Sequence, residues 1–362
     1  MKPVLLRLTS LVWRPTLTAL RGWALASVIA NAVIIATGEA VRLSSSGLGC
    51  PDWPTCTKSS AVAAHSAGQT TLNSWIEFGN RLLNFPLVAI AGLTFIAFLR
   101  YYQTSGRTRK DLVWLAALLP LGVIAQAVLG GILVLAKLNP ALVSAHFLLS
   151  TAVILTAAVV LHQRAAVLVA AAALAPTQPL PAPPRPVRRD LRVLAGVLSG
   201  MTALMLAAGT VVTGTGPLAG TTVDSHGHRT TVPRFHFSLE SVTQVHADIG
   251  WFIAALAVAL VIGLRFAGGS PRTVRLGWTV LGGLGVQGVI GYVQYFNHLP
   301  AGLVWVHVST AVVLWIFVLQ LFLSTGTGLP SPARAAAAAA PERTGDDRAG
   351  EPGPRRSPAT SR

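Results

Sequence analysis

The stretch Gln126-Ala-Val-Leu-Gly130, followed by His146, returns later in the chain as Gln287-Gly-Val-Ile-Gly291, followed by His307. The glutamine moves from position 126 to 287 and the histidine from 146 to 307, so both are displaced by 161 positions. Both copies lie in long apolar segments, where an ionisable residue is costly and marks a functional site by default. The sequence therefore predicts a duplicated unit that carries a polar site inside a membrane.

The composition is that of a membrane protein with many spans. Hydrophobic residues make up 52% of the 362 residues and charged ones 11%, and the mean hydropathy is +0.60, whereas a soluble domain has about 25% charged residues. Because a helix needs roughly 20 apolar residues to cross a bilayer, we expect an all-α polytopic membrane protein with eight transmembrane helices. The predicted spans are Trp23–Val41, Trp75–Phe98, Leu112–Ala136, Leu142–Leu161, Leu194–Thr213, Val245–Leu264, Val274–Val293 and Leu303–Leu323.

The basic residues follow the expected membrane topology. Lysine and arginine number 28 against 12 aspartates and glutamates, which gives a net charge of +16. They concentrate in alternate loops and at the two ends of the chain, as expected for the cytoplasmic side of a membrane. We therefore expect a multi-pass cell-membrane protein in the lipid bilayer, with cytoplasmic N- and C-termini, the cysteine-containing loop on the outer face, and no nucleic-acid partner.

The chain is predicted to consist of two halves with the same direction in the membrane. Each half has an even number of helices, so the repeat is parallel rather than inverted. The predicted segments are residues 1–22 (cytoplasmic N-terminus), 23–161 (first four-helix half), 162–192 (Pro- and Arg-rich cytoplasmic linker), 193–325 (second four-helix half) and 326–362 (disordered cytoplasmic tail).

Cys50 and Cys56 are the only cysteines, and both fall in the first long outer loop. Two cysteines close together on an oxidising face usually form a disulfide. We expect a Cys50–Cys56 disulfide. The alternatives are two free thiols, or a metal-binding pair whose other ligands are absent.

Three of the nine histidines, His146, His246 and His307, are predicted within the first turns of a span, counted from the outer face. Imidazole suits zinc, copper and haem iron. Zinc usually takes a tetrahedral set of ligands, and no such set is evident, whereas two histidines on separate helices suit the axial positions of haem iron. His246 and His307 are therefore the predicted haem pair, and the alternative for any one histidine is an interhelical hydrogen bond.

The second helix of the first half offers different chemistry. Glu77, Asn80 and Arg81 share one helix face by their spacing. When Asn80 is aligned with His246, the first half has an amide where the second half has an imidazole. An ionised carboxylate costs about 2.5–3.5 kcal/mol at membrane depth, which favours a functional role for Glu77 over the alternative, an interfacial Glu77–Arg81 ion pair. The first half therefore suits a bound molecule that is changed and released.

Five motifs resemble those of the haem A synthase family. They are Gly47-Leu-Gly-Cys50-Pro-Asp-Trp-Pro-Thr-Cys56, Glu77-Phe-Gly-Asn80-Arg81, Val212-Thr-Gly-Thr-Gly-Pro217, Val245-His246-Ala-Asp248 and Val306-His307. The cysteine loop and the glutamate motif together make the resemblance specific, whereas a lone membrane histidine would not.

The resemblance extends over about residues 23–325 and implies an eight-helix enzyme built of two halves. It implies oxidation of a ring methyl of haem O to the formyl group of haem A, which terminal oxidases use. His246 and His307 would ligate a haem b cofactor. The implied partners are haem O, a membrane enzyme that produces it, and an electron acceptor.

In the first half the resemblance implies that Glu77 is catalytic and stabilises positive charge that develops at the methyl carbon. His146, Asn80 and Arg81 would bind the substrate haem. The family often has histidine where this chain has Asn80, and asparagine is not a usual ligand of haem iron. Either His146 is the single protein ligand of the substrate iron, or water or another group takes the opposite side.

Two other function classes fit part of the pattern. A non-catalytic b-type cytochrome subunit for electron transfer would prefer histidine pairs in both halves. A transporter built of parallel repeats would prefer broken helices at matching places, whereas Pro86 and Pro120 interrupt spans only in the first half. The unequal site residues of the two halves favour the enzyme.

Overall fold

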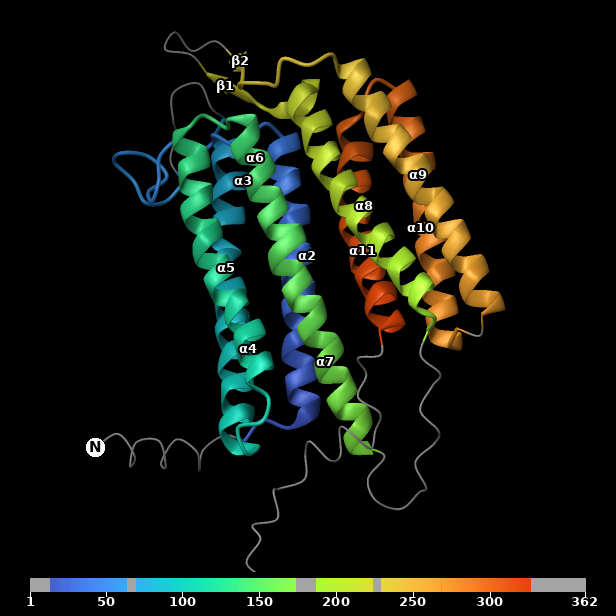
Figure 1. Cartoon of the computed structure of the whole chain (residues 1–362). Helices are drawn as coiled ribbons and strands as arrows, with labels where there is room; N and C mark the ends of the chain where they lie inside the picture. The colour runs from blue at the N-terminus through green and yellow to red at the C-terminus, as the bar shows by residue number, and fades with distance from the viewer. Residues whose placement is uncertain (1–13, 64–69, 174–186, 224–228, 268, 327–362) are drawn as a thin grey trace, which may run out of the picture.

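The computed structural model describes residues 14–63, 70–173, 187–223, 229–267 and 269–326 (Figure 1). In this part of the chain, eight helical segments are long and apolar enough to cross a membrane. The predicted all-helical, multi-pass fold is therefore confirmed. The first 13 residues, the proline-rich run at 174–186 and the predicted tail from 327 lie outside the described residues.

The first group of helices starts at Leu17 and ends at Ala173. It comprises α2 (Leu17–Leu43), α3 (Thr71–Leu82), α4 (Asn84–Thr104), α5 (Lys110–Leu135), α6 (Pro140–Leu148), the π-helix η1 (Leu149–Leu155) and α7 (Thr156–Ala173). Helix α7 continues well past Leu161, so the start of the predicted linker is helical.

The predicted span Trp75–Phe98 is not one continuous helix. It is divided at Leu83, between α3 and α4. Pro86 has no amide hydrogen to donate to the carbonyl of Leu82, and its ring would clash with that carbonyl in an unbroken helix. The division makes α3 a short separate helix that carries the predicted acidic motif.

The predicted span Leu142–Leu161 also contains an irregular segment, the π-helix η1. Trp315 of α11 (Ala301–Thr325) is only 4% exposed, and its indole Nε1–H donates to the Thr151 carbonyl at 3.1 Å and the Thr156 hydroxyl at 3.2 Å. A π-helix departs from the regular α-helical hydrogen-bond ladder, and this indole provides its backbone with a partner from outside the helix. The segment η1, which follows His146 in the chain, is thus in contact with α11.

The second group comprises α8 (Arg189–Thr215), α9 (Leu239–Phe266), α10 (Pro271–Phe296) and α11. Between α8 and α9 a short antiparallel hairpin forms from β1 (Thr221–Val223) and β2 (Arg229–Thr231), which the sequence had not predicted. Next to it, Ala219 and Val232 are buried in one apolar cluster with residues of the first group, namely Leu48, Val134 and Leu138. The long loop of the second group therefore packs on the end of the first group that carries the cysteine loop.

The two groups lie side by side and share one apolar core (Figure 1). Helices α2 and α7 pack against α11, and α6 packs against α8. Polar contacts also join them. Besides the Trp315 bonds, the Trp305 indole donates to the Ala36 carbonyl at 2.9 Å and the Arg42 guanidinium donates to the Thr213 carbonyl at 2.6 Å. The helices that carry the three predicted histidine ligands thus belong to one packed unit.

Candidate functional site

His246 and His307 face each other from α9 and α11. Their ring centres are 6.4 Å apart and their planes are inclined by 64°. In both rings Nδ1 is buried without a hydrogen-bond partner among the described residues. The other ring nitrogen, Nε2, makes no hydrogen bond with the described part of the chain and is not buried in the way that Nδ1 is. Nε2 is therefore the nitrogen that a ligand could reach.

This separation fits a metal between the two rings. A bond between a metal and an imidazole nitrogen is about 2 Å long, and the ring centre lies roughly 1 Å beyond the nitrogen, so two imidazoles on opposite sides of one iron have centres about 6 Å apart. The predicted pair is therefore brought together with the spacing that axial ligation of a haem requires.

Each of the three intramembrane histidines lies against a glycine of a neighbouring helix. A Cβ atom added to Gly209 or Gly291 would lie 3.3 Å from His246 Cε1 or 3.5 Å from His307 Cε1, respectively. A Cβ on Gly130 would lie 3.3 Å from His146 Cε1. Small residues let neighbouring helices and their side chains approach closely, so these glycines leave room for the rings.

The repeated glutamines hold the backbone at two of these histidines. Gln126 donates to the His146 carbonyl at 2.9 Å and to the Ser150 hydroxyl at 2.6 Å. Gln287 donates to the His307 carbonyl at 3.2 Å and to the Thr310 hydroxyl at 2.8 Å. The glutamines are therefore positioning residues for the histidines that follow them in each copy of the motif.

In the first group of helices, His146 is on α6 and Asn80 is on α3. His146 Nδ1 and Asn80 Oδ1 are both buried without a hydrogen-bond partner in the described part of the chain. Buried polar atoms normally have partners, so the unpaired Asn80 oxygen marks a position that a bound group could complete. His146 Nδ1 lies on the side of α5, 3.9 Å from a Cβ added at Gly130. Among the described residues no hydrogen bond joins Asn80 to His146.

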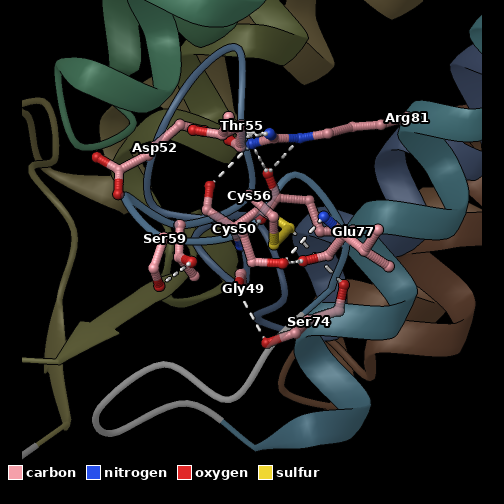
Figure 2. Close-up of a disulfide and its surroundings, with 12 residues drawn as sticks. Gly49, Cys50, Asp52, Thr55, Cys56, Ser59, Ser74, Glu77 and Arg81 are labelled. Atoms are coloured by element: carbon pink, nitrogen blue, oxygen red, sulfur yellow. Dashed lines mark hydrogen bonds and ion pairs between the residues drawn. A yellow bond between two sulfur atoms is a disulfide. The ribbon is translucent and has the colours of Figure 1, made fainter.

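Glu77 forms the centre of a second polar cluster, on α3 beside the cysteine loop (Figure 2). The side chain is 6% exposed. One carboxylate oxygen, Oε1, accepts from Arg81 at 2.6 Å and 3.2 Å, and the other, Oε2, accepts from the backbone N–H of Cys50 at 2.8 Å. The ion pair considered as an alternative from the sequence is thus present, and Glu77 is also bonded to the loop.

Arg81 is engaged with the same loop rather than directed at open space. Its Nη1 donates to the carbonyls of Asp52 and Thr55 at 3.1 Å and 3.2 Å, and its Nη2 donates to the carbonyl of Cys50 at 2.8 Å. A guanidinium can serve several acceptors in a fixed plane. In this structure Arg81 therefore fixes the loop. The sequence predicted Arg81 only as a residue that binds the substrate haem, and the contact with the loop was not predicted.

Cys50 and Cys56 form a disulfide with an S–S distance of 2.02 Å, which confirms the expected bond over the two alternatives. The loop is further tied to α3, because the Ser74 hydroxyl donates to the Gly49 carbonyl at 2.9 Å. The predicted site residues thus fall into three places: the loop cluster of Glu77 and Arg81, the region of His146, and the pair of His246 and His307.

A buried ion pair near the C-terminal end of α2 was missed from the sequence. Glu39 and Arg42 are 3.6 Å apart, and Arg42 also donates to the last turn of α8 at Thr213. Glu39 is 8% exposed. Their i,i+3 spacing inside an apolar span could have predicted the ion pair. The structure shows that Arg42 of this pair also connects α2 to α8.

A family model described as "Cytochrome oxidase assembly protein", COX15-CtaA, matches residues 21–319 of the chain. A protein of Geobacillus thermodenitrificans named Heme A synthase is 28% identical over 119 residues, which are 33% of this chain and 34% of that protein. A protein of Lysinibacillus sphaericus with the same name is 27% identical over 131 residues, or 36% and 40% of the two chains. The matched part is thus little more than a third of the length of these relatives, whereas the family model extends over most of the chain. The chain belongs to the COX15-CtaA family of cytochrome oxidase assembly proteins.

Proposed function

We propose that this protein is a haem A synthase, an intramembrane enzyme that oxidises a ring methyl of haem O to the formyl group of haem A. The arrangement of His246 and His307 carries the proposal, because their ring centres, 6.4 Å apart, leave the space that one axially ligated iron requires. The names of the curated relatives and the family match support the same activity.

The overall reaction balances with water as the source of oxygen. A methyl group and one water give a formyl group, four protons and four electrons. Two molecules of a membrane-soluble quinone would take up these protons and electrons and leave as quinols, so the proposal requires an external oxidant of this class. A separate membrane enzyme would supply haem O.

The second group of helices would hold the cofactor permanently. His246 and His307 face each other from two helices. The Gln287 amide holds the His307 backbone, and the glycines at 209 and 291 leave room for the rings. Bound between these histidines, haem b would supply one-electron redox chemistry. The protein's own contribution is a pair of ligands from two packed helices.

The first group of helices would hold the substrate. His146 is the single imidazole there, and Asn80 replaces a second one, so the iron of haem O would be held more weakly than the iron of the cofactor. Weak ligation suits a molecule that must enter and leave. The unpaired Oδ1 of Asn80 supports a bound group in this half.

Glu77 would provide negative charge near the carbon that is oxidised. Its hydrogen bonds to Arg81 and to the Cys50 amide fix the carboxylate before the substrate arrives. A charged group held in advance costs no reorganisation during the reaction. The same two contacts tie the carboxylate to the cysteine loop, so the position of the loop and the position of the charge depend on each other.

The two halves would be copies of one unit with different chemistry. The glutamine-to-histidine-carbonyl bond occurs in both, at positions displaced by the same 161 residues. A parallel repeat of this kind, with both termini cytoplasmic and the cysteine loop outside, would place all three histidines near the outer face.

The proposal is tested by producing the chain in a host that makes haem O but no haem A. We expect haem A to appear in extracted membrane pigments, identified by chromatography and mass spectrometry. A matched chain with His307→Ala is the control and should give none. If the unchanged protein binds haem b and yields no haem A, the activity is contradicted and an electron-transfer subunit becomes the better interpretation.

A further inference from the structure

Trp53 lies within the loop that the Cys50–Cys56 disulfide closes, and its ring packs directly on helix α5 at Gly131. A Cβ atom added to Gly131 would lie 2.5 Å from Trp53 Cδ2 and 2.8 Å from Trp53 Cε2. Real Cβ atoms essentially never approach so closely. The indole therefore occupies the space that a side chain at position 131 would need.

This contact brings Trp53 next to the wall of the proposed substrate site. Gly131 follows Gly130, the residue that lies against the His146 ring. Successive residues of a helix point in directions about 100° apart, so the indole and the imidazole pack on adjoining faces of the same turn of α5. A residue of the outer loop thus reaches the helix surface that borders His146.

Residues before and after Trp53 in the loop are held in place, which fixes Trp53 on α5. Arg81 Nη1 donates to the carbonyls of Asp52 and Thr55, which flank the Trp53-Pro54 segment, and the disulfide closes the loop behind them (Figure 2). Trp53 nevertheless remains 43% exposed. Its position is fixed while part of its ring remains free to contact another molecule.

The second half has no such arrangement at the corresponding position. The displacement of 161 that relates the repeated glutamines and histidines takes Gly131 to Tyr292. Tyr292 has a large side chain of its own, and its hydroxyl accepts from the Trp251 indole at 3.1 Å. The inserted tryptophan is therefore specific to the half in which the bound molecule would have to exchange.

We propose that Trp53 is a substrate-positioning residue: its indole, seated on Gly131, forms the outer wall of the site in front of His146 and packs against the haem O macrocycle. The identity of the ligand, haem O, rests on the proposed function. The wall itself rests only on the contact between Trp53 and Gly131. An aromatic ring packs favourably against a planar macrocycle.

Labelling of histidines with diethyl pyrocarbonate tests the wall without any assay of turnover. We expect Trp53→Ala to raise the labelling rate of His146 about tenfold, because a contact of this size limits access to the site. Gly131→Ala should do the same, since its Cβ displaces the indole. The rate is read by mass spectrometry relative to His298, which is exposed in a loop.

Gly92→Ala is the matched control, because a Cβ at Gly92 meets no atom within 4 Å. It should leave His146 labelling unchanged. An unchanged rate in both Trp53→Ala and Gly131→Ala would overturn the inference. An equal rise at His162, at the other end of the same span, would mean general loosening and would also contradict it.

The ligand is tested separately with haem O. Trp53→Ala should raise the KM for haem O about tenfold with a smaller change in kcat, while Trp53→Phe keeps most of the affinity and the haem b spectrum stays the same. Trp114→Phe, a change at an exposed residue of α5, should have no effect. Faster His146 labelling in a protein that forms no haem A would support the wall while contradicting the proposed reaction.

Discussion

Alanine at His246 or His307 is expected to remove the low-spin b-type spectrum and to lower bound haem b to below about a tenth of one equivalent. Each change removes one of two axial ligands and leaves a buried space that the remaining imidazole cannot close. The measurement is the reduced-minus-oxidised absorption spectrum of the purified protein, with haem content determined per chain. His146→Ala should retain the b-type spectrum, because His146 lies in the other half.

His298→Ala is the control for histidine replacement, since His298 is in an exposed loop between α10 and α11. It should keep the full spectrum. Retention of the low-spin spectrum in both His246→Ala and His307→Ala would place the cofactor elsewhere and remove the main support for the proposed function.

Glu77→Gln is expected to lower the formation of haem A by about a hundredfold or more, the loss typical for removal of one preorganised electrostatic group. Glutamine has the same shape, and its carbonyl oxygen can still accept from the Cys50 amide. The negative charge and its two hydrogen bonds with Arg81 are lost. The loop and the disulfide should remain, because Arg81 still donates to three carbonyls of the loop. The readout is the ratio of haem A to haem O in membranes of the producing host, with the b-type spectrum as a check of folding.

Glu77→Ala separates charge from loop attachment, because it removes both. It should also release the loop, which hydrogen exchange of residues 50–56 would detect. If Glu77→Gln makes normal amounts of haem A while Glu77→Ala makes none, then Glu77 acts only by holding the loop. That result would end the catalytic assignment and leave the fold of the site unchanged.

The helices could be predicted from the sequence because each depends on a continuous apolar run. The division at Leu83 also has a local cause, Pro86, so it was within reach of sequence reasoning. The π-helix was not, because no residue of Leu149–Leu155 forbids a regular helix. Its partner, the Trp315 indole, comes from a helix far away in the chain.

The same distinction holds for the site. The three histidines could be predicted because a polar residue in an apolar span is conspicuous, and Glu77 and Arg81 because their spacing places them together. The engagement of Arg81 with three loop carbonyls, and the seating of Trp53 on Gly131, depend on how the cysteine loop folds back over α3 and α5. Such tertiary contacts leave no periodic pattern in the sequence.

Extraction and identification of the haems bound to the purified protein, from a host that makes haem O, tests the central claim most directly. Two halves with one fixed and one exchangeable site predict haem b together with haem O or haem A in the same protein, and loss of haem b alone in His307→Ala. Two equivalents of haem b, or no haem at all, would contradict it.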